Sequence, residues 1–540
     1  MNLMSFFPDE YEPLPQQVEI IPRIERAFES GKKFVICCAP TGSGKSFLAK
    51  TLANSSSISP TEFIKSIESN QAFAVDQFGA YLDPDDCSGM PTFGAMALTI
   101  TKTLQDQYIS LFDDSKALKG KANHTCAIDP KFTVDIAPCI FNSDLKHECQ
   151  VANKCPYYNS RNETLVSQFG VLNYSMFLSL PGHVKKRDFI ICDEASELED
   201  ELVKRFSREL NYKVLKKMNI SITSIPINNY TKFRIWLESF VGDLSEEVNT
   251  LMDSMKKKKT STSLVDRQRL SLFRNLHMSL KTTIETWDDC EYILEKTNEA
   301  ITLKPLRIDK LSQHIFNYGE KILLMSATII DHKHFARTLG ITDYEYIEVD
   351  STFSAKKAPI FCTGRVKLNY KNLKSSLPYI AKQIKNLCDQ HKDVKGVIHT
   401  HTMEITNYLR NNLNDPRFIF RGDGMTNEQI LKQHLEDPSP TILVSPSLTY
   451  GVDLKDDLAR FQILVKAAYM PLGDERIKRL FKEDGQWYVN KMLNNLIQAC
   501  GRGVRSVDDY CVTYILDGCI VDAVIQNKTR LPKYFLKRFN

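Results

Sequence analysis

The stretch APTGSGKS (residues 39–46) follows an apolar segment, FVICC (34–38), and precedes a helix-like segment, FLAKTLA (47–53). A glycine-rich turn between a buried strand and a helix places backbone N–H groups at the helix N-terminus, where they can surround phosphate groups. Gly42 and Gly44 permit a backbone conformation and a close approach that a Cβ would obstruct. The stretch therefore predicts an α/β domain that binds a nucleotide.

The side chains of this stretch have distinct expected roles. Lys45 would reach the β- and γ-phosphates of ATP, and the Ser46 hydroxyl would bind Mg²⁺. Ala39 stands where such loops usually carry their first glycine, which is a mild departure. The alternative, a glycine-rich turn that binds nothing, is disfavoured because both the strand and the helix flank it. The residues expected to surround the nucleotide are Thr41, Gly42, Ser43, Gly44, Lys45 and Ser46.

A pair of carboxylates, Asp193-Glu194, ends the apolar segment FIIC (189–192). We expect Asp193 to hold the Mg²⁺ shell and Glu194 to orient and deprotonate the attacking water. Such a pair at a strand end is common by chance, so the phosphate-binding stretch is needed to give it weight. Together the two motifs predict ATP hydrolysis.

Near the C-terminus, QACGRGVR (498–505) places four residues at helical spacings of i, i+3, i+4 and i+7. This spacing predicts one helix face on which two arginines point the same way. Guanidinium groups aimed across a domain cleft can stabilise the charge on a γ-phosphate. In isolation a salt-bridged surface helix would be the better interpretation. The four residues are Gln498, Gly501, Arg502 and Arg505.

Residues 111–160, here called the cysteine segment, have weak helix and strand periodicity, as a small module held by a metal would. Four thiolates separated by 12, 9 and 5 residues suit a 4Fe-4S cluster, which needs no fixed short spacing. A tetrahedral zinc site would use the same ligands, and the residues alone favour zinc. The expected ligands are Cys126, Cys139, Cys149 and Cys155.

Composition sets wider limits on the chain. A chain of 540 residues should contain several domains, and 42% hydrophobic with 25% charged residues is ordinary for a globular protein. The net charge of +4 permits a polyanionic partner without requiring one. We find no apolar run long enough to span a membrane and no signal peptide. We therefore expect a cytoplasmic protein of a prokaryotic or virus-infected cell, with the nucleus as the alternative.

The motifs together resemble the XPD/DinG branch of superfamily 2 helicases, and they occur in the same order along most of the chain. DEAS (193–196) resembles the DEAH box, with Ser196 in place of histidine. Gln17 resembles the adenine contact of this family. The other matching segments are 39–46 (motif I), 101–107 (Ia), 326–328 (III), 396–402 (IV), 449–453 (V) and 498–505 (VI).

The resemblance implies two RecA-like P-loop motor domains with an inserted iron–sulfur module and a helical arch. It divides the chain into motor domain 1 (1–110, 161–198 and 301–348, with an insertion at about 54–91), the cysteine segment (111–160), the arch segment (199–300) and motor domain 2 (349–540). Residues 118–126 and 155–161 resemble the family's cluster-binding segments, so the resemblance favours iron–sulfur over zinc.

The implied activity is ATP-dependent 5′ to 3′ translocation on single-stranded DNA, with duplex unwinding in replication, repair or recombination. Gly451 and Asp453 would join the ATP site. The residues expected to contact DNA phosphates are Thr101, Lys102, Thr103, Thr402 and Thr449. Single-stranded and tailed duplex DNA are the expected partners, and we expect a monomer.

The same motifs are compatible with two other functions. One is a strand-stimulated ATPase that remodels R-loops or protein–DNA complexes with little unwinding. The other is a non-catalytic scaffold that binds single strands, against which Lys45, Glu194 and Arg502 argue. Trp487-Tyr488 could stack a base, but an aromatic pair ahead of a helix more often packs in the core.

Overall fold

The computed structural model describes residues 2–59, 61–62, 92–140, 142–258, 263–420, 426–446, 456–501, 503–504 and 509–540. Most of the insertion expected at 54–91 lies outside these residues. Among the described helices, none combines the length and the apolar character needed to cross a membrane.

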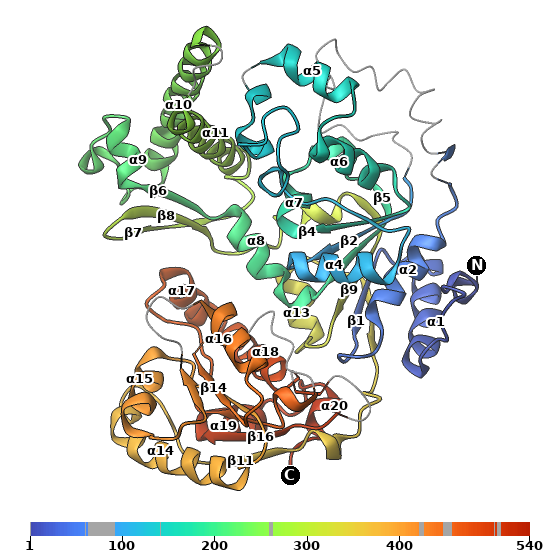
Figure 1. Cartoon of the computed structure of the whole chain (residues 1–540), viewed down its shortest axis with the longest axis vertical. Coiled ribbons are helices and arrows are strands. Elements are labelled where there is room, and N and C mark those ends of the chain that lie inside the picture. The colour runs from blue at the N-terminus through green and yellow to red at the C-terminus, as the bar shows by residue number, and fades with distance from the viewer. Residues whose placement is uncertain are drawn as a thin grey trace.

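The first α/β unit is built on a seven-stranded parallel sheet of order β10-β1-β9-β5-β2-β4-β3 (Figure 1). Parallel sheets are covered on both faces, which explains why their strands are apolar throughout rather than alternating. The strands are β1 (Phe34–Cys38), β2 (Ala95–Thr99), β3 (Lys116–Ala117), β4 (Phe169–Asn173), β5 (Arg187–Asp193), β9 (Gly319–Ser326) and β10 (Tyr344–Glu348). The predicted strands FVICC and FIIC are confirmed.

Helices cover both faces of this sheet. Val35 and Cys37 of β1 pack with one set of helices, and Ile36 and Cys38 with the other. The first set is α1 (Pro15–Glu29), α2 (Lys45–Asn54) and α4 (Lys102–Leu111); the second is α7 (Tyr174–Ser179), α8 (Leu198–Phe206), α12 (Gln313–Phe316) and α13 (His332–Thr338). Because the strands are parallel, β1, β5 and β9 end at the same edge, where the predicted nucleotide site lies.

The second α/β unit is a six-stranded parallel sheet of order β11-β16-β15-β12-β14-β13. Its strands are β11 (Ile360–Val366), β12 (Gly396–His399), β13 (Phe418–Phe420), β14 (Ile442–Ser445), β15 (Phe461–Leu464) and β16 (Val512–Asp517). Its helices are α14 (Leu373–Gln390), α15 (Met403–Asn412), α16 (Asn427–Glu436), α17 (Glu475–Glu483), α18 (Gly485–Cys500), α19 (Gly518–Gln526) and α20 (Lys533–Leu536). The predicted pair of α/β units is confirmed.

The arch segment contains two long helices, α10 (Tyr230–Lys258) and α11 (Leu264–Glu285), that project beside the first unit (Figure 1). These helices agree with the helical segment expected here, but the segment also contains strands that the sequence analysis did not predict. Antiparallel strands β6 (Arg208–Asn211), β8 (Ala300–Pro305) and β7 (Tyr292–Lys296) form a sheet at its base, with α9 (Tyr212–Lys217) alongside. Strands of four to six residues carry too little period-two alternation to stand out among charged helices.

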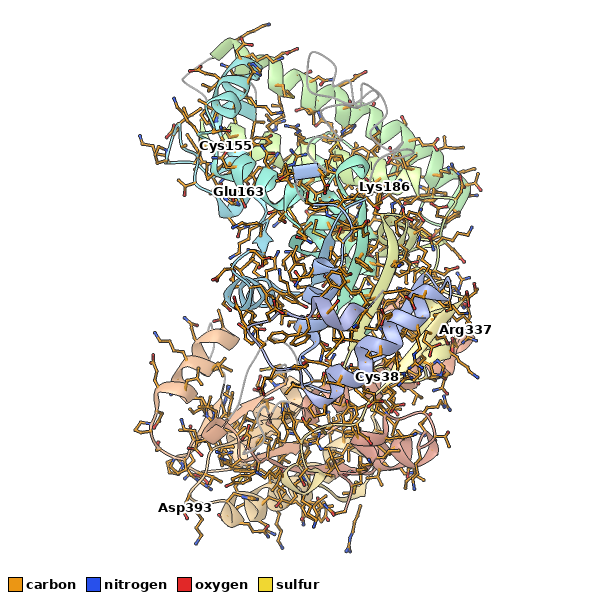
Figure 2. The ribbon with its side chains drawn as sticks, turned by 90° about the vertical axis from the view of Figure 1, so that its right-hand side faces the viewer. Cys38, Cys155, Glu163, Lys186, Arg337 and Asp393 are labelled. Carbon is orange, nitrogen blue, oxygen red and sulfur yellow. The ribbon has the colours of Figure 1, made fainter. Side chains whose placement is uncertain are left out.

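The cysteine segment consists of short turns and two helices, α5 (Ser143–Val151) and α6 (Pro156–Val166). Ile140 packs against the core of the arch segment, and Arg267 of α11 donates to the Ile136 carbonyl at 3.3 Å. β3 lies within the range assigned to this segment but pairs with β4 in the first sheet. Figure 2 shows Cys155 beside the arch helices, toward the end of the molecule opposite Asp393 of the second unit.

The two α/β units meet around one buried carboxylate, Glu199 of α8. Arg476 of α17 donates to Glu199 Oε1 at 2.9 Å, and the Trp487 indole of α18 donates to Oε2 at 2.9 Å. Lys491 Nζ lies 3.0 Å from the same Oε2. Trp487 and Tyr488 are buried, which confirms that this aromatic pair packs in the core. We call Glu199, Arg476, Trp487 and Lys491 the hinge cluster.

The charges of the hinge cluster compensate one another. Burial alone would raise the pKa of Glu199, but Lys491 and Arg476 outweigh burial and lower it to about 2, from an ordinary 4.5. A carboxylate with a lowered pKa stabilises the fold above its ordinary pKa and loses that contribution as the pH falls. The stabilisation by Glu199 is therefore complete above pH 4.5 and declines toward pH 2.

Glu199→Gln should destabilise the junction of the two units by about 3–5 kcal/mol, because it leaves Arg476 buried without a carboxylate and leaves Lys491 with Asp200 alone. Urea unfolding at neutral pH measures this, and the deficit should shrink as the pH falls below 4.5. Glu475→Gln is the control, since Glu475 and Lys478 are half exposed and such pairs contribute about 0–1 kcal/mol. Equal effects of the two substitutions would contradict a special role for Glu199.

Candidate nucleotide site between the two units

The glycine-rich loop lies between β1 and α2, as the sequence predicts. Gly42 and Gly44 have φ angles of +81° and +70°, in the left-handed region that residues with a Cβ rarely adopt. α2 begins at Lys45, so the loop directs its backbone toward a helix N-terminus. Lys45 Nζ donates to the Ala39 carbonyl at 3.3 Å, which holds the ammonium over the loop.

Gln17, the predicted adenine contact, is hydrogen-bonded to the glycine-rich loop. Its Nε2 donates to the Gly44 carbonyl at 3.0 Å, and its Oε1 accepts from the Leu14 N–H at 2.7 Å. The neighbouring Gln16 donates to the Asp350 carbonyl at 3.2 Å, in the linker between the two units. The two glutamines thus tie α1 to both the loop and the linker.

The linker also contributes Phe353, which sequence analysis did not single out. A Cβ on Gly42 would lie 2.4 Å from Phe353 Cζ, so the ring packs directly on the loop. The same ring packs against Val504 and Cys511 of the second unit. Phe353 therefore joins the glycine-rich loop to the segment that follows α18.

Asp193 is the last residue of β5 and is buried. Its Oδ2 accepts from the Tyr108 hydroxyl at 3.0 Å, and its Oδ1 accepts from the Glu194 N–H at 3.0 Å. Burial and the Glu194 charge raise the pKa of Asp193 to about 6, although Lys45 acts in the opposite direction. A divalent cation would favour the charged form.

Glu194 lies beside a hydrogen-bonded group of three hydroxyls, those of Ser196, Ser326 and Thr328. Ser196 stands at the position of the DEAH histidine. Ser326 Oγ, at the end of β9, donates to Ser196 Oγ at 3.0 Å and lies 3.3 Å from Glu194 Oε2. Thr328 Oγ1 also donates to Ser196, at 3.0 Å. Segment 326–328 is thus joined to 193–196 through hydroxyl groups, without an imidazole.

A cavity of about 310 Å³ opens between the two units at this edge. From the first unit it is lined by the loop, by α4 and by Glu194 and Glu197; from the second unit it is lined by Gln498, Gly501 and Val504. Gln498 Nε2 donates to Glu197 Oε1 at 2.8 Å, so α18 touches the carboxylate-bearing segment directly. Burial and Asp200 raise the pKa of Glu197 to about 7.

Segment 498–505 differs from the helix face that the sequence predicts. α18 ends at Cys500, with Gly501 as its C-cap, because two glycines in three residues disfavour a helix. Gln498 is therefore on the helix and Gly501 is not part of it. Arg502 and Arg505 lie outside the described residues, as do Thr449, Gly451 and Asp453 of the expected ATP and DNA contacts.

Two of the predicted DNA contacts cap helices. Thr101 accepts from the Leu104 N–H at the start of α4, and Thr402 accepts from the Ile405 N–H at the start of α15. Thr103 is exposed and lines the cavity. Lys102 donates to Asn123 of the cysteine segment at 2.6 Å. Helix N-termini of this kind suit phosphate groups.

The four predicted cluster ligands come from different parts of the cysteine segment, with Cys149 in α5 and Cys155 at the start of α6, and three of the four are buried. Burial raises the pKa of Cys139, and the Cys126 and Cys155 thiols raise it further. Burial and the other three thiols likewise raise the pKa of Cys149. The four thiols are thus neighbours. Within the described part of the chain, no three His, Cys, Asp or Glu side chains are placed to hold a single metal ion.

Gly42→Ala should weaken ATP binding at least about tenfold, because Ala strains a positive φ by about 1–2 kcal/mol and its Cβ would collide with Phe353. Titration with a fluorescent ATP analogue measures this. Gly31→Ala is the matched control, since its φ of +86° gives the same strain with no atom within 4 Å of the added Cβ. Adding Phe353→Ala to Gly42→Ala should restore part of the affinity. No restoration would contradict the ring contact.

Comparison with known proteins adds to this geometry. Residues 397–536 match the family model of a helicase C-terminal domain, which covers most of the second unit. No curated protein sequence matches the chain.

Solved structures resemble the chain over nearly its whole length. A structure named XPD helicase aligns with a TM-score of 0.61 and 15% identity, covering 96% of this chain and 98% of the other. Xpd4 from S. tokodaii aligns with a TM-score of 0.55 and 15% identity, covering 95% of this chain and 97% of the other. A structure named XPD apo aligns with a TM-score of 0.56 and 14% identity, covering 94% of this chain and 98% of the other. The chain therefore has the fold of the XPD helicases, and its second unit carries a helicase C-terminal domain.

Proposed function

We propose that this chain is an ATP-dependent DNA helicase of the XPD/DinG kind, which translocates 5′ to 3′ on single-stranded DNA and unwinds duplex. The observation that carries the proposal is the contact of Gln498 with Glu197, beside Asp193-Glu194 and the glycine-rich loop. Through this contact a segment of the second unit lies against Glu197, three residues after Glu194, the proposed base. Hydrolysis at such a junction can drive the units to open and close.

Each residue of the proposed site has a chemical task. The loop N–H groups and Lys45 bind the ATP phosphates, while Ser46 and Asp193 would hold Mg²⁺, which stabilises charge on the transferred phosphoryl group. Glu194 orients the attacking water and accepts its proton. Arg502 and Arg505 are proposed to meet the γ-phosphate from the second unit.

Single-stranded DNA is proposed to cross both units. Thr101, Lys102 and Thr103 would bind its phosphates on the first unit, and Thr402 and Thr449 on the second. Contacts to phosphate are independent of base sequence and weaken with salt. The 5′ to 3′ polarity rests on the likeness to the XPD helicases.

Cys126, Cys139, Cys149 and Cys155 are proposed to hold a 4Fe-4S cluster. Four neighbouring thiols are the donor set of such a cluster. In such a cluster each of the four cysteines would contribute one thiolate, so the four sulfurs would not have to converge on a single metal ion as in a zinc site. When bound, the cluster would supply a rigid cross-link between the parts of the segment that carry the four cysteines.

Strand separation with ATP on duplexes carrying a 5′ or a 3′ tail tests the proposed activity. The wild-type chain should separate only the 5′-tailed duplex. Lys45→Ala should lose ATP hydrolysis and strand separation while it keeps single-strand binding, since Lys45 serves the nucleotide alone. ATP hydrolysis stimulated by single strands, with neither duplex separated, would favour the remodelling ATPase instead. A Lys45→Ala protein that still unwinds would overturn the mechanism.

Metal analysis of protein purified without oxygen tests the cysteine segment. We expect about four iron and four sulfide per chain, with broad visible absorption, since a 4Fe-4S cluster has that composition. Cys155→Ser should lower the iron content sharply. Cys290→Ser, a cysteine outside this segment, is the control and should leave it unchanged. One zinc per chain and no sulfide would show a zinc site instead.

A further inference from the structure

Two tyrosines hold Asp193 from opposite faces of the first sheet. Tyr108 of α4 belongs to the core on one face, and Tyr174 of α7 to the core on the other. Both are essentially inaccessible to solvent, with 1% and 0% exposure. Their hydroxyls nevertheless have different partners. Tyr108 donates to the carboxylate oxygen Oδ2 at 3.0 Å, and Tyr174 donates to the Asp193 backbone carbonyl at 2.9 Å.

The Tyr108 hydrogen bond completes the restraint of the carboxylate. Oδ1 already accepts from the Glu194 N–H at 3.0 Å, so Tyr108 gives the second oxygen its own donor. With both oxygens bonded, the carboxylate cannot rotate about its terminal torsion without losing a hydrogen bond. In a buried site such a loss is costly. Tyr174 has no comparable effect, because the carbonyl it binds does not turn with the side chain.

The helix that carries Tyr108 is itself firmly placed. Gln105, one turn earlier and fully buried, donates to the Leu118 and Val171 carbonyls at the edge of the sheet. The Tyr108 ring packs edge-on against Phe169, at 5.8 Å between centroids. Thr101, Thr103 and Gln107 of the same helix line the cavity. One helix thus faces the cavity and holds the carboxylate.

We propose that Tyr108 is a positioning residue that holds the Asp193 carboxylate in the orientation required to meet Mg²⁺ carried by the nucleotide beside Ser46. This inference rests on the proposed ATP site. Hydrogen-bond partners of metal-binding carboxylates typically account for about 10–100-fold in metal affinity. The effect of Tyr108 should therefore be confined to the metal-dependent part of nucleotide binding.

Tyr108→Phe removes the hydroxyl and keeps the ring, and Tyr174→Phe is its matched control. The measurement is the Kd of a fluorescent ATP analogue, titrated in excess Mg²⁺ and again in EDTA. For Tyr108→Phe we expect a loss of about tenfold or more in Mg²⁺ and no change in EDTA. For Tyr174→Phe we expect less than about a twofold change in either condition, because its hydroxyl does not touch the carboxylate.

The outcomes separate this inference from the proposed function. If Tyr108→Phe binds the Mg²⁺ complex as wild type does, Tyr108 is not a positioning residue, although the ATP site stands. Equal losses in Mg²⁺ and EDTA, or equal losses in both variants, would also overturn the inference, because they would reflect packing. A wild-type chain that binds no nucleotide in either condition would overturn the proposed function, and this inference with it.

Discussion

The arrangement of the molecule depends on one buried carboxylate, Glu199, which two cations and an indole of the second unit surround. α8 carries this residue one turn after the segment that bears Asp193 and Glu194, and α18 carries both Lys491 and Gln498. The hinge cluster therefore sets the distance between the carboxylates of the first unit and the end of α18. A second contact to the start of α18, His334 of α13 with Asp484 at 2.9 Å, acts in the same direction.

The charges at the cavity are balanced differently. Asp193 and Glu197 are buried with fewer compensating cations, and burial raises their pKa to about 6 and about 7. Glu199, with two cations in contact, has a pKa of about 2. The carboxylates beside the cavity thus lack the positive charge that the hinge cluster has. A divalent cation bound with the nucleotide, or an arginine of the second unit, would supply this positive charge.

Hydroxyl groups connect segments 193–196 and 326–328. Ser326 and Thr328 both donate to Ser196, which stands where the DEAH box of the resembling family has histidine. Phe353 and Tyr108 also join separate segments. Phe353 packs on the glycine-rich loop and against Val504 and Cys511, and the Tyr108 hydroxyl of α4 donates to Asp193 of β5.

The sequence by itself determined the two parallel α/β units, the strand–loop–helix around Lys45 and the position of Asp193-Glu194 at a strand end, because these follow from apolar runs and glycine placement in short segments. The glycines at 501 and 503 could also have predicted the end of α18 at Cys500, whereas the short strands of the arch segment have too weak a local pattern to be predicted. Only the tertiary structure brought Tyr108, Glu199 and Phe353 to the site. Their partners lie 85 or more residues away for Tyr108 and Glu199, and no local pattern encodes a hydrogen bond between segments that meet only when the chain folds.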